Sequence, residues 1–220
     1  MFYQQGDAVQ LALSSYIPPT ANNLAPIPGG WGMLYGSGPQ ITSYDYSVTH
    51  NGHVSIRVDA HVQGVDINYW REVNTKQIIP VSPGDHIVFK VWVKTGPSTI
   101  GKDCIYPSSV VVGFDYYSAT HRLREHSSDN PRCDIDPTWQ TQYDDPGVFI
   151  PMNSDWILRI LDTIVPTQVW DDSIGRLATE PIIGIIGILV AGSYTNWVNG
   201  VQVQDEGQVW FADAELYINP

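Results

Sequence analysis

The chain has 220 residues, of which 43% are hydrophobic and only 15% are charged, and its formal net charge is −12. The charged fraction is well below the globular average of about 25%, while Gly, Pro and uncharged polar residues are abundant. A nucleic-acid partner is excluded because a binder must neutralise phosphates, and the same charge disfavours anionic membranes. Neutral sugars, cationic partners and divalent metal ions remain compatible with it.

The N-terminal residues 1–22 are expected to form an arm that is separate from the main domain. Val9, Leu11 and Leu13 alternate with other residues as in an edge strand, and a Pro- and Gly-rich connector follows over residues 17–30. The first residues lack the basic and apolar regions of a signal peptide, so we expect a mature form, and the alternative is a protein that is not exported. Residues 23–220 are expected to form one domain.

Strand patterns dominate that domain. The turn dipeptide Asn51-Gly52 leads into an alternating run, and similar runs follow with turn residues between them. Residues 155–165 fit a strand or a short helix, and we favour the strand because Pro166 ends it. The apolar run at 181–192 is too short to insert into a membrane and predicts one or two buried strands. The strands are predicted at residues 53–59, 65–73, 87–94, 110–117 and 208–219.

The resulting fold class is all-β, a sandwich of two antiparallel sheets. A long polar insertion is expected at about residues 118–154. Cys104 and Cys133 flank much of it, and a disulfide between them would stabilise the fold by roughly 3–4 kcal/mol and imply an oxidising compartment. Two unrelated buried thiols are the alternative.

Four motifs resemble those of the galactose-binding-like, jelly-roll carbohydrate-binding modules. They are the Asn-Leu-Ala-Pro…Trp opening at residues 23–31, the His-x-Gly-x-x-Ser-Ile-Arg strand at 50–57, the Val-Ser-Pro-Gly…Val-Trp-Val-Lys segment at 81–94, and the Val-Trp-Phe-Ala-Asp-Ala-Glu-Leu strand at 209–216. The resemblance implies a jelly roll that binds sugar on a sheet face through stacked aromatic rings and planar polar side chains. It also implies a structural calcium ion between the start and end of the sandwich, near Asp213 and Asn23.

Residues 65–73 offer a set of side chains suited to sugar. If the aliphatic residues of this run face inward, then Asp66, Asn68, Trp70 and Glu72 face outward together. The alternative is that Trp70 covers a neighbouring loop and the polar side chains are only solvated. The remaining predicted ligand-binding residues are Asp115 and Tyr117, which share one side of a strand, and the turn-region tryptophans Trp31 and Trp197.

Calcium is the expected cofactor, with a structural role. Hard cations prefer carboxylate and carbonyl oxygens, and Asp134 and Asp136 in the polar insertion add candidates to Asp213 and Asn23. Solvated acidic loops are the alternative reading of the same residues.

The sequence predicts a non-catalytic module that recognises an extracellular polysaccharide or a cell-surface glycan. No nucleophile elbow, phosphate loop or zinc-protease helix is present in the sequence. The alternative is a structural subunit of an extracellular filament or surface assembly, which would self-associate by exchanging a strand within residues 1–16.

Overall fold

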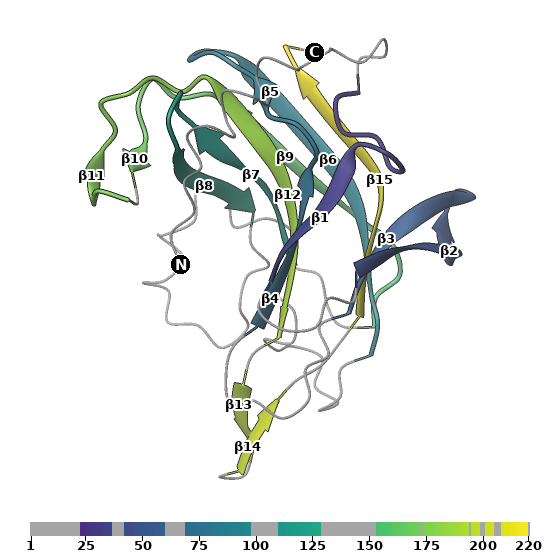
Figure 1. Ribbon diagram of the computed structural model, residues 1–220. Helices are drawn as coiled ribbons and strands as arrows, with labels where there is room; N and C mark the ends of the chain where they lie inside the picture. Colours follow the sequence, from purple (N-terminus) through teal and green to yellow (C-terminus); the bar gives the residue numbers. More distant parts are fainter. Residues whose placement is uncertain are drawn as a thin grey trace.

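The computed structural model of the protein describes residues 23–36, 42–59, 69–97, 110–128, 153–171, 173–193, 195–198, 201–204 and 208–219. Every regular element within these ranges is a β-strand, and two large antiparallel sheets lie face to face (Figure 1). The chain passes back and forth between the sheets, and the expected all-β sandwich of two antiparallel sheets is confirmed. In the described ranges no helix has the length and apolar character that a membrane crossing requires.

One sheet has the order β1-β4-β12-β7-β8, with the short β5 also paired to β12. Its inner face is built by alternation: Val73, Leu189 and Val112 are directly opposite one another and all are buried. Its strands are β1 (Trp31–Gly36), β4 (Tyr69–Thr75), β5 (Ile79–Pro80), β7 (Val110–Tyr117), β8 (Arg122–Ser128) and β12 (Gly184–Ser193).

The second sheet has the order β2-β3-β15-β6-β9. Ile87, Phe89, Val91 and Val93 of β6 face the core, while the residues between them face outward. Its strands are β2 (Thr42–His50), β3 (His53–Asp59), β6 (His86–Thr95), β9 (Ile157–Ile164) and β15 (Gln208–Ile218), and two small hairpins lie outside the sheets, β10 (Trp170–Asp171) with β11 (Arg176–Leu177) and β13 (Thr195–Val198) with β14 (Val201–Gln204).

The predicted strands match β3, β4, β6, β7 and β15, and the 155–165 stretch is the strand β9 rather than a helix. The β2–β3 turn forms where expected, because Asn51 and Gly52 adopt left-handed φ values of 50° and 81°. The expected polar insertion needs correction at its start, because residues 122–128 pair with β7 as the edge strand β8. This strand has the sequence RLREHSS, which contains a single apolar residue, so no hydrophobic alternation marks it as a strand.

Several predictions fall outside the described residues. They are the N-terminal arm at 1–22 with the strand exchange assigned to residues 1–16, and the disulfide between Cys104 and Cys133.

Gly184 fits β12 closely against β5. A Cβ added there would overlap Cγ2 of Ile78 and lie 3.3 Å from the carbonyl oxygen of Ile79. Ile78 is β-branched and buried, so its methyl group has little freedom to move. We expect Gly184→Ala to lower the free energy of unfolding by about 1–3 kcal/mol in urea titrations. Gly96→Ala is the control, because its Cβ would meet neighbours only at 3.4 Å or more, and equal losses for both variants would contradict the explanation.

Candidate functional site

The predicted sugar-binding row lies only partly in the described chain. Trp70 and Glu72 are in β4, where the backbone register places them opposite Gly192 and Val190 of β12. Asp66 and Asn68 precede β4 and lie outside the described residues. The row therefore stays a prediction.

Asp115 and Tyr117 share one side of β7, as the spacing predicts, and both side chains are buried. Oδ1 of Asp115 forms an ion pair with Nη2 of Arg122 at 2.7 Å. The Tyr117 ring packs against Ile78. Both side chains thus contact other residues of the protein, and their role in ligand binding stays a prediction.

The two turn-region tryptophans have different positions. Trp31 is 3% exposed, its ring stacks on Phe89 at 6.0 Å between centroids, and its Nε1 donates to the carbonyl of Ala25 at 3.0 Å. Its placement as a ligand-binding residue is corrected, because a ring enclosed by the core has no free face. Trp197 pairs with Gln202 in the β13–β14 hairpin, and its role remains a prediction.

Two of the four residues expected to bind calcium, Asn23 and Asp213, have oxygens that accept hydrogen bonds from N–H donors. Oδ1 of Asn23 accepts hydrogen bonds from the backbone N–H groups of Ala25 and Leu216, and its Nδ2 donates to the carbonyl of Ala214. Both carboxylate oxygens of Asp213 accept hydrogen bonds from imidazole N–H groups. Calcium is bound by oxygen ligands, and N–H donors directed at the same carboxylate do not fit such a set. Among the residues that the structure describes, no group of three or more His, Cys, Asp or Glu is placed to hold a metal ion. Asp134 and Asp136 lie outside those residues.

Asp213 instead anchors two histidines of the β2–β3 hairpin. It occupies a bulge in β15, with φ of 47°, where the pairing with β6 shifts register. His50 Nδ1 donates to its Oδ2 and His53 Nδ1 donates to its Oδ1, each at 2.6 Å. His53 keeps 66% of its side chain exposed. We call this group of His50, His53 and Asp213 the histidine clamp.

Two tryptophan rings adjoin the histidine clamp. The His50 ring stacks on Trp92 with centroids 4.4 Å apart, and it lies 5.2 Å from Trp156 at a tilt of 57°. Trp92 projects from the outer face of β6, because its neighbours Val91 and Val93 fill the core. Trp156 immediately precedes β9, and both tryptophans are half-buried. This surface, Trp92 and Trp156 with the histidine clamp, is the aromatic patch.

Two ion pairs lie on the same sheet face. Lys94 Nζ contacts Oδ1 of Asp155 at 2.9 Å, and this lysine holds the pKa of the Asp155 carboxyl below its usual range. Arg57 Nε contacts Oδ1 of Asp59 at 2.8 Å, and that contact raises the pKa of the guanidinium. The aromatic patch is therefore bordered by hydrogen-bonding groups, beside rings that can stack.

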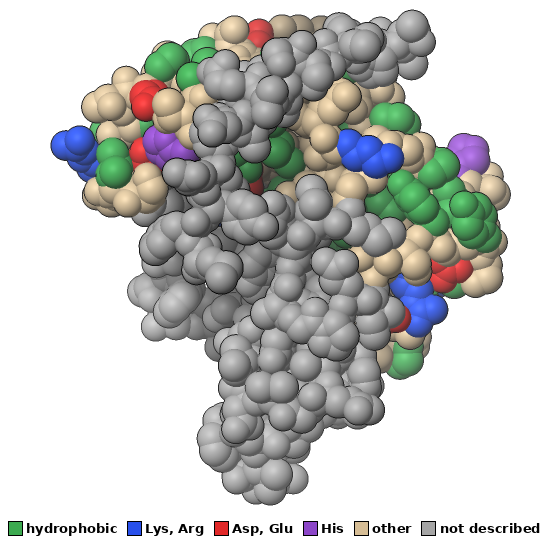
Figure 2. Space-filling view, in the orientation of Figure 1, with side chains coloured by type: hydrophobic (Ala, Val, Ile, Leu, Met, Phe, Trp, Pro, Cys, Tyr) green, Lys and Arg blue, Asp and Glu red, His purple; other side chains and the backbone are tan. Residues whose placement is uncertain are grey.

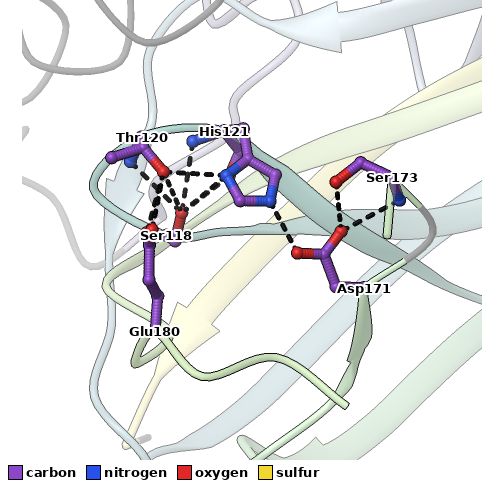
Figure 3. A network of polar contacts seen from close by, with 6 residues as sticks. All are labelled: Ser118, Thr120, His121, Asp171, Ser173 and Glu180. Atoms are coloured by element: carbon purple, nitrogen blue, oxygen red, sulfur yellow. Dashed lines mark hydrogen bonds and ion pairs between the residues drawn. The ribbon is translucent and has the colours of Figure 1, made fainter. Parts of the chain in front are cut away.

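A second polar cluster lies at the opposite edge of the molecule, and histidine side chains show at both places in Figure 2. His121 Nε2 donates to Oδ2 of Asp171 at 2.7 Å, and Ser173 donates to Oδ1 of the same carboxylate through its N–H and its hydroxyl (Figure 3). Thr120 Oγ1 donates to Glu180 at 2.8 Å. The cluster joins the β7–β8 turn to the β10–β11 hairpin and is satisfied by its own members.

The pKa values of both acids in this cluster are lowered. Burial acts to raise the pKa of Asp171, but the hydrogen bonds from Ser173 and His121 outweigh it. Hydrogen bonds from Ser118 and Thr120 lower the pKa of Glu180. Because each polar group already has a partner within the cluster, we assign it to holding the hairpin in place.

Sequence reasoning missed the aromatic patch. Histidines beside a tight turn such as Asn51-Gly52 are typical of surface residues, and a tryptophan inside a strand motif, such as Trp92, is typical of packing. The spacing of His50 and His53 does place both at one hairpin end, but Asp213 is more than 150 residues further along the chain. Nothing local in the sequence indicates that contact.

Neither the protein-family models nor the curated proteins match this sequence. Solved structures that resemble it are mostly carbohydrate-binding modules with β-sandwich folds. One is a module of the β-sandwich superfamily, studied for promiscuous specificity, with 11% identity over 88% of this chain and 60% of that one, and a TM-score of 0.47. Another is the family 11 module from Clostridium thermocellum in complex with a mixed-linked tetrasaccharide, with 11% identity over 89% of this chain and 94% of that one, and a TM-score of 0.42.

A third similar structure is the enzymatically active domain of tailspike protein 4 from bacteriophage CBA120. It is 9% identical, with a TM-score of 0.44, and the match covers 91% of this chain but only 21% of that one. This chain therefore spans less than two thirds of the tailspike chain and of the superfamily module. At these TM-scores the similarity does not assign a ligand to the chain.

Proposed function

We propose that the protein is a non-catalytic module that binds an extracellular polysaccharide or a cell-surface glycan at the aromatic patch. The observation that carries the proposal is the gathering of Trp92, Trp156 and the histidine clamp on the outer face of one sheet. Sugar rings present C–H surfaces that pack on aromatic faces, and their hydroxyls exchange hydrogen bonds with charged side chains such as Lys94 and Asp155 beside the rings. Both kinds of group meet at this patch.

The four sequence motifs support the same function, because they resemble carbohydrate-binding modules. The charge of the chain supports it as well, since a net charge of −12 repels polyanionic partners. The binding face differs from the predicted one: the row at Trp70 belongs to the six-stranded sheet, whereas the aromatic patch lies on the five-stranded sheet.

A panel of soluble polysaccharides in affinity electrophoresis, followed by calorimetry on the ligands that retard the protein, tests the proposal. We expect Trp156→Ala to weaken binding at least about tenfold, because the loss of a stacked ring removes both contact area and ring attraction. Trp170→Ala is the matched control, since Trp170 is 43% exposed but lies in the β10–β11 hairpin. Binding that survives in Trp156→Ala and is lost in Trp70→Ala would move the site to β4, and no binding to any glycan would refute the function.

A further inference from the structure

The end of the β2–β3 hairpin crosses the outer face of the five-stranded sheet. Its last pairing with β15 joins Ile56 to Phe211, and the hairpin leaves the ladder beyond that point. The ring of His50 nevertheless reaches Trp92 in β6, which is on the far side of β15 in the sheet order. The hairpin end at His50 and His53 therefore lies over β15, and we call residues 46–54 the strap.

Few contacts hold the strap against the sheet. Most of its side chains are exposed or half-buried, with Tyr46 77% exposed, whereas the side chain of His50, which faces the sheet, is only 11% exposed. The described contacts from the strap to β15, β6 and the start of β9 are the two hydrogen bonds to Asp213 and the rings of Trp92 and Trp156, while within the hairpin Ser55 of β3 donates to the carbonyl of Val48. A segment with so little buried surface opens at a small free-energy cost. Its attachment rests on the histidine clamp.

His50 occupies the place that a ligand ring would need. Its imidazole lies 4.4 Å from Trp92 at an interplanar angle of 29°, which is a stacked arrangement. A sugar ring packing on this face of Trp92 would require the same space. The histidine and the sugar therefore compete for one ring face.

We propose that the strap closes the aromatic patch against itself, and that a glycan binds by displacing His50 from Trp92. This inference rests on the proposed function. If only a fraction of the molecules have the strap open, the apparent affinity for the glycan is the intrinsic affinity multiplied by that fraction. A change that destabilises the closed strap therefore strengthens binding. Asp213 stabilises the closed strap, because its carboxylate accepts hydrogen bonds from both histidines of the strap.

The test compares His50→Ala with His86→Ala. His86 donates to Asp162 at the same distance, 2.6 Å, on the same sheet, and is the matched control. We expect His50→Ala to raise glycan affinity about two- to tenfold, which is the range that loss of an aromatic stack gives, and His86→Ala to leave affinity unchanged. Asp213→Asn is the second variant: asparagine tolerates the left-handed φ, and we expect it to release the strap and raise affinity as well.

Hydrogen exchange provides a readout that does not depend on affinity. We expect the amides of residues 47–54 to exchange faster when wild-type protein is saturated with glycan, and acrylamide to quench tryptophan fluorescence more strongly in His50→Ala without glycan. Weaker glycan binding by His50→Ala, or slower exchange in the strap on glycan addition, would overturn the proposal that the glycan displaces His50. The binding site would still be supported if Trp156→Ala weakens binding. If Trp156→Ala binds normally, the proposed function itself fails.

Discussion

Replacing Trp31 with alanine is expected to lower the free energy of unfolding by about 3–5 kcal/mol. The ring is 3% exposed, stacks on Phe89 of the opposite sheet and belongs to the buried core cluster. Its removal leaves a cavity that the surrounding strands can fill only in part, and the carbonyl of Ala25 loses its indole donor. Urea unfolding followed by circular dichroism measures the loss.

The same variant separates two roles for this tryptophan. A ligand-binding Trp31 would give a stable protein with weakened glycan binding, whereas a packing Trp31 gives an unstable protein that binds normally while folded. Trp170→Ala is the stability control, and we expect its unfolding free energy to stay within about 0.5 kcal/mol of wild type because the ring is exposed. A stable Trp31→Ala protein would show that the core does not depend on this ring.

Asp171→Ala is expected to cost about 2–4 kcal/mol of unfolding free energy, because its buried carboxylate accepts hydrogen bonds from Ser173 and His121. Its side chain is only 3% exposed. Asp162→Ala removes a carboxylate from another histidine pair at a similar distance, but that carboxylate is 62% exposed and its loss should cost at most about 1 kcal/mol. Equal losses for the two variants would show that burial does not matter here.

The cost of Asp171→Ala should also depend on pH. The pKa of Asp171 is lowered in the folded protein, so the unfolded chain binds the proton more readily. The stabilisation is therefore fully present above the ordinary aspartate pKa of about 3.9, and it is lost as the pH falls through the lowered folded-state pKa. We expect the stability difference between wild type and Asp171→Ala to narrow from pH 5 to pH 3. A constant difference over that range would contradict the assignment.

Local pattern predicted the strands where one face is apolar and the other polar. Strands β3 and β7 begin and end at the predicted residues, because β3 alternates Val and Ile with polar residues and β7 is rich in Val, Phe and Tyr. Strand β8 was missed because its alternation is not hydrophobic, and β1 because Pro and Gly residues precede it. The sequence predicted the turn at Asn51-Gly52, because a tight hairpin turn requires left-handed backbone and these two residue types adopt it readily.

The candidate site was less readable, because exposure is a property of the packed molecule. Trp31, Trp92 and Trp170 are the same residue type, yet the first fills the core, the second lies beneath His50 and the third is exposed. A sequence shows that an aromatic ring is present but not which side of it another strand covers.

The sequence by itself determined the all-β class and most strand positions, since these follow from periodicity and turn residues. Only the tertiary structure decided which sheet presents the aromatic patch and that Asp213 joins His50 and His53. The physical reason is that a local pattern fixes the two faces of a strand. The order of strands in a sheet, and the bulge that aims Asp213 at the hairpin, come from contacts between residues far apart in the chain.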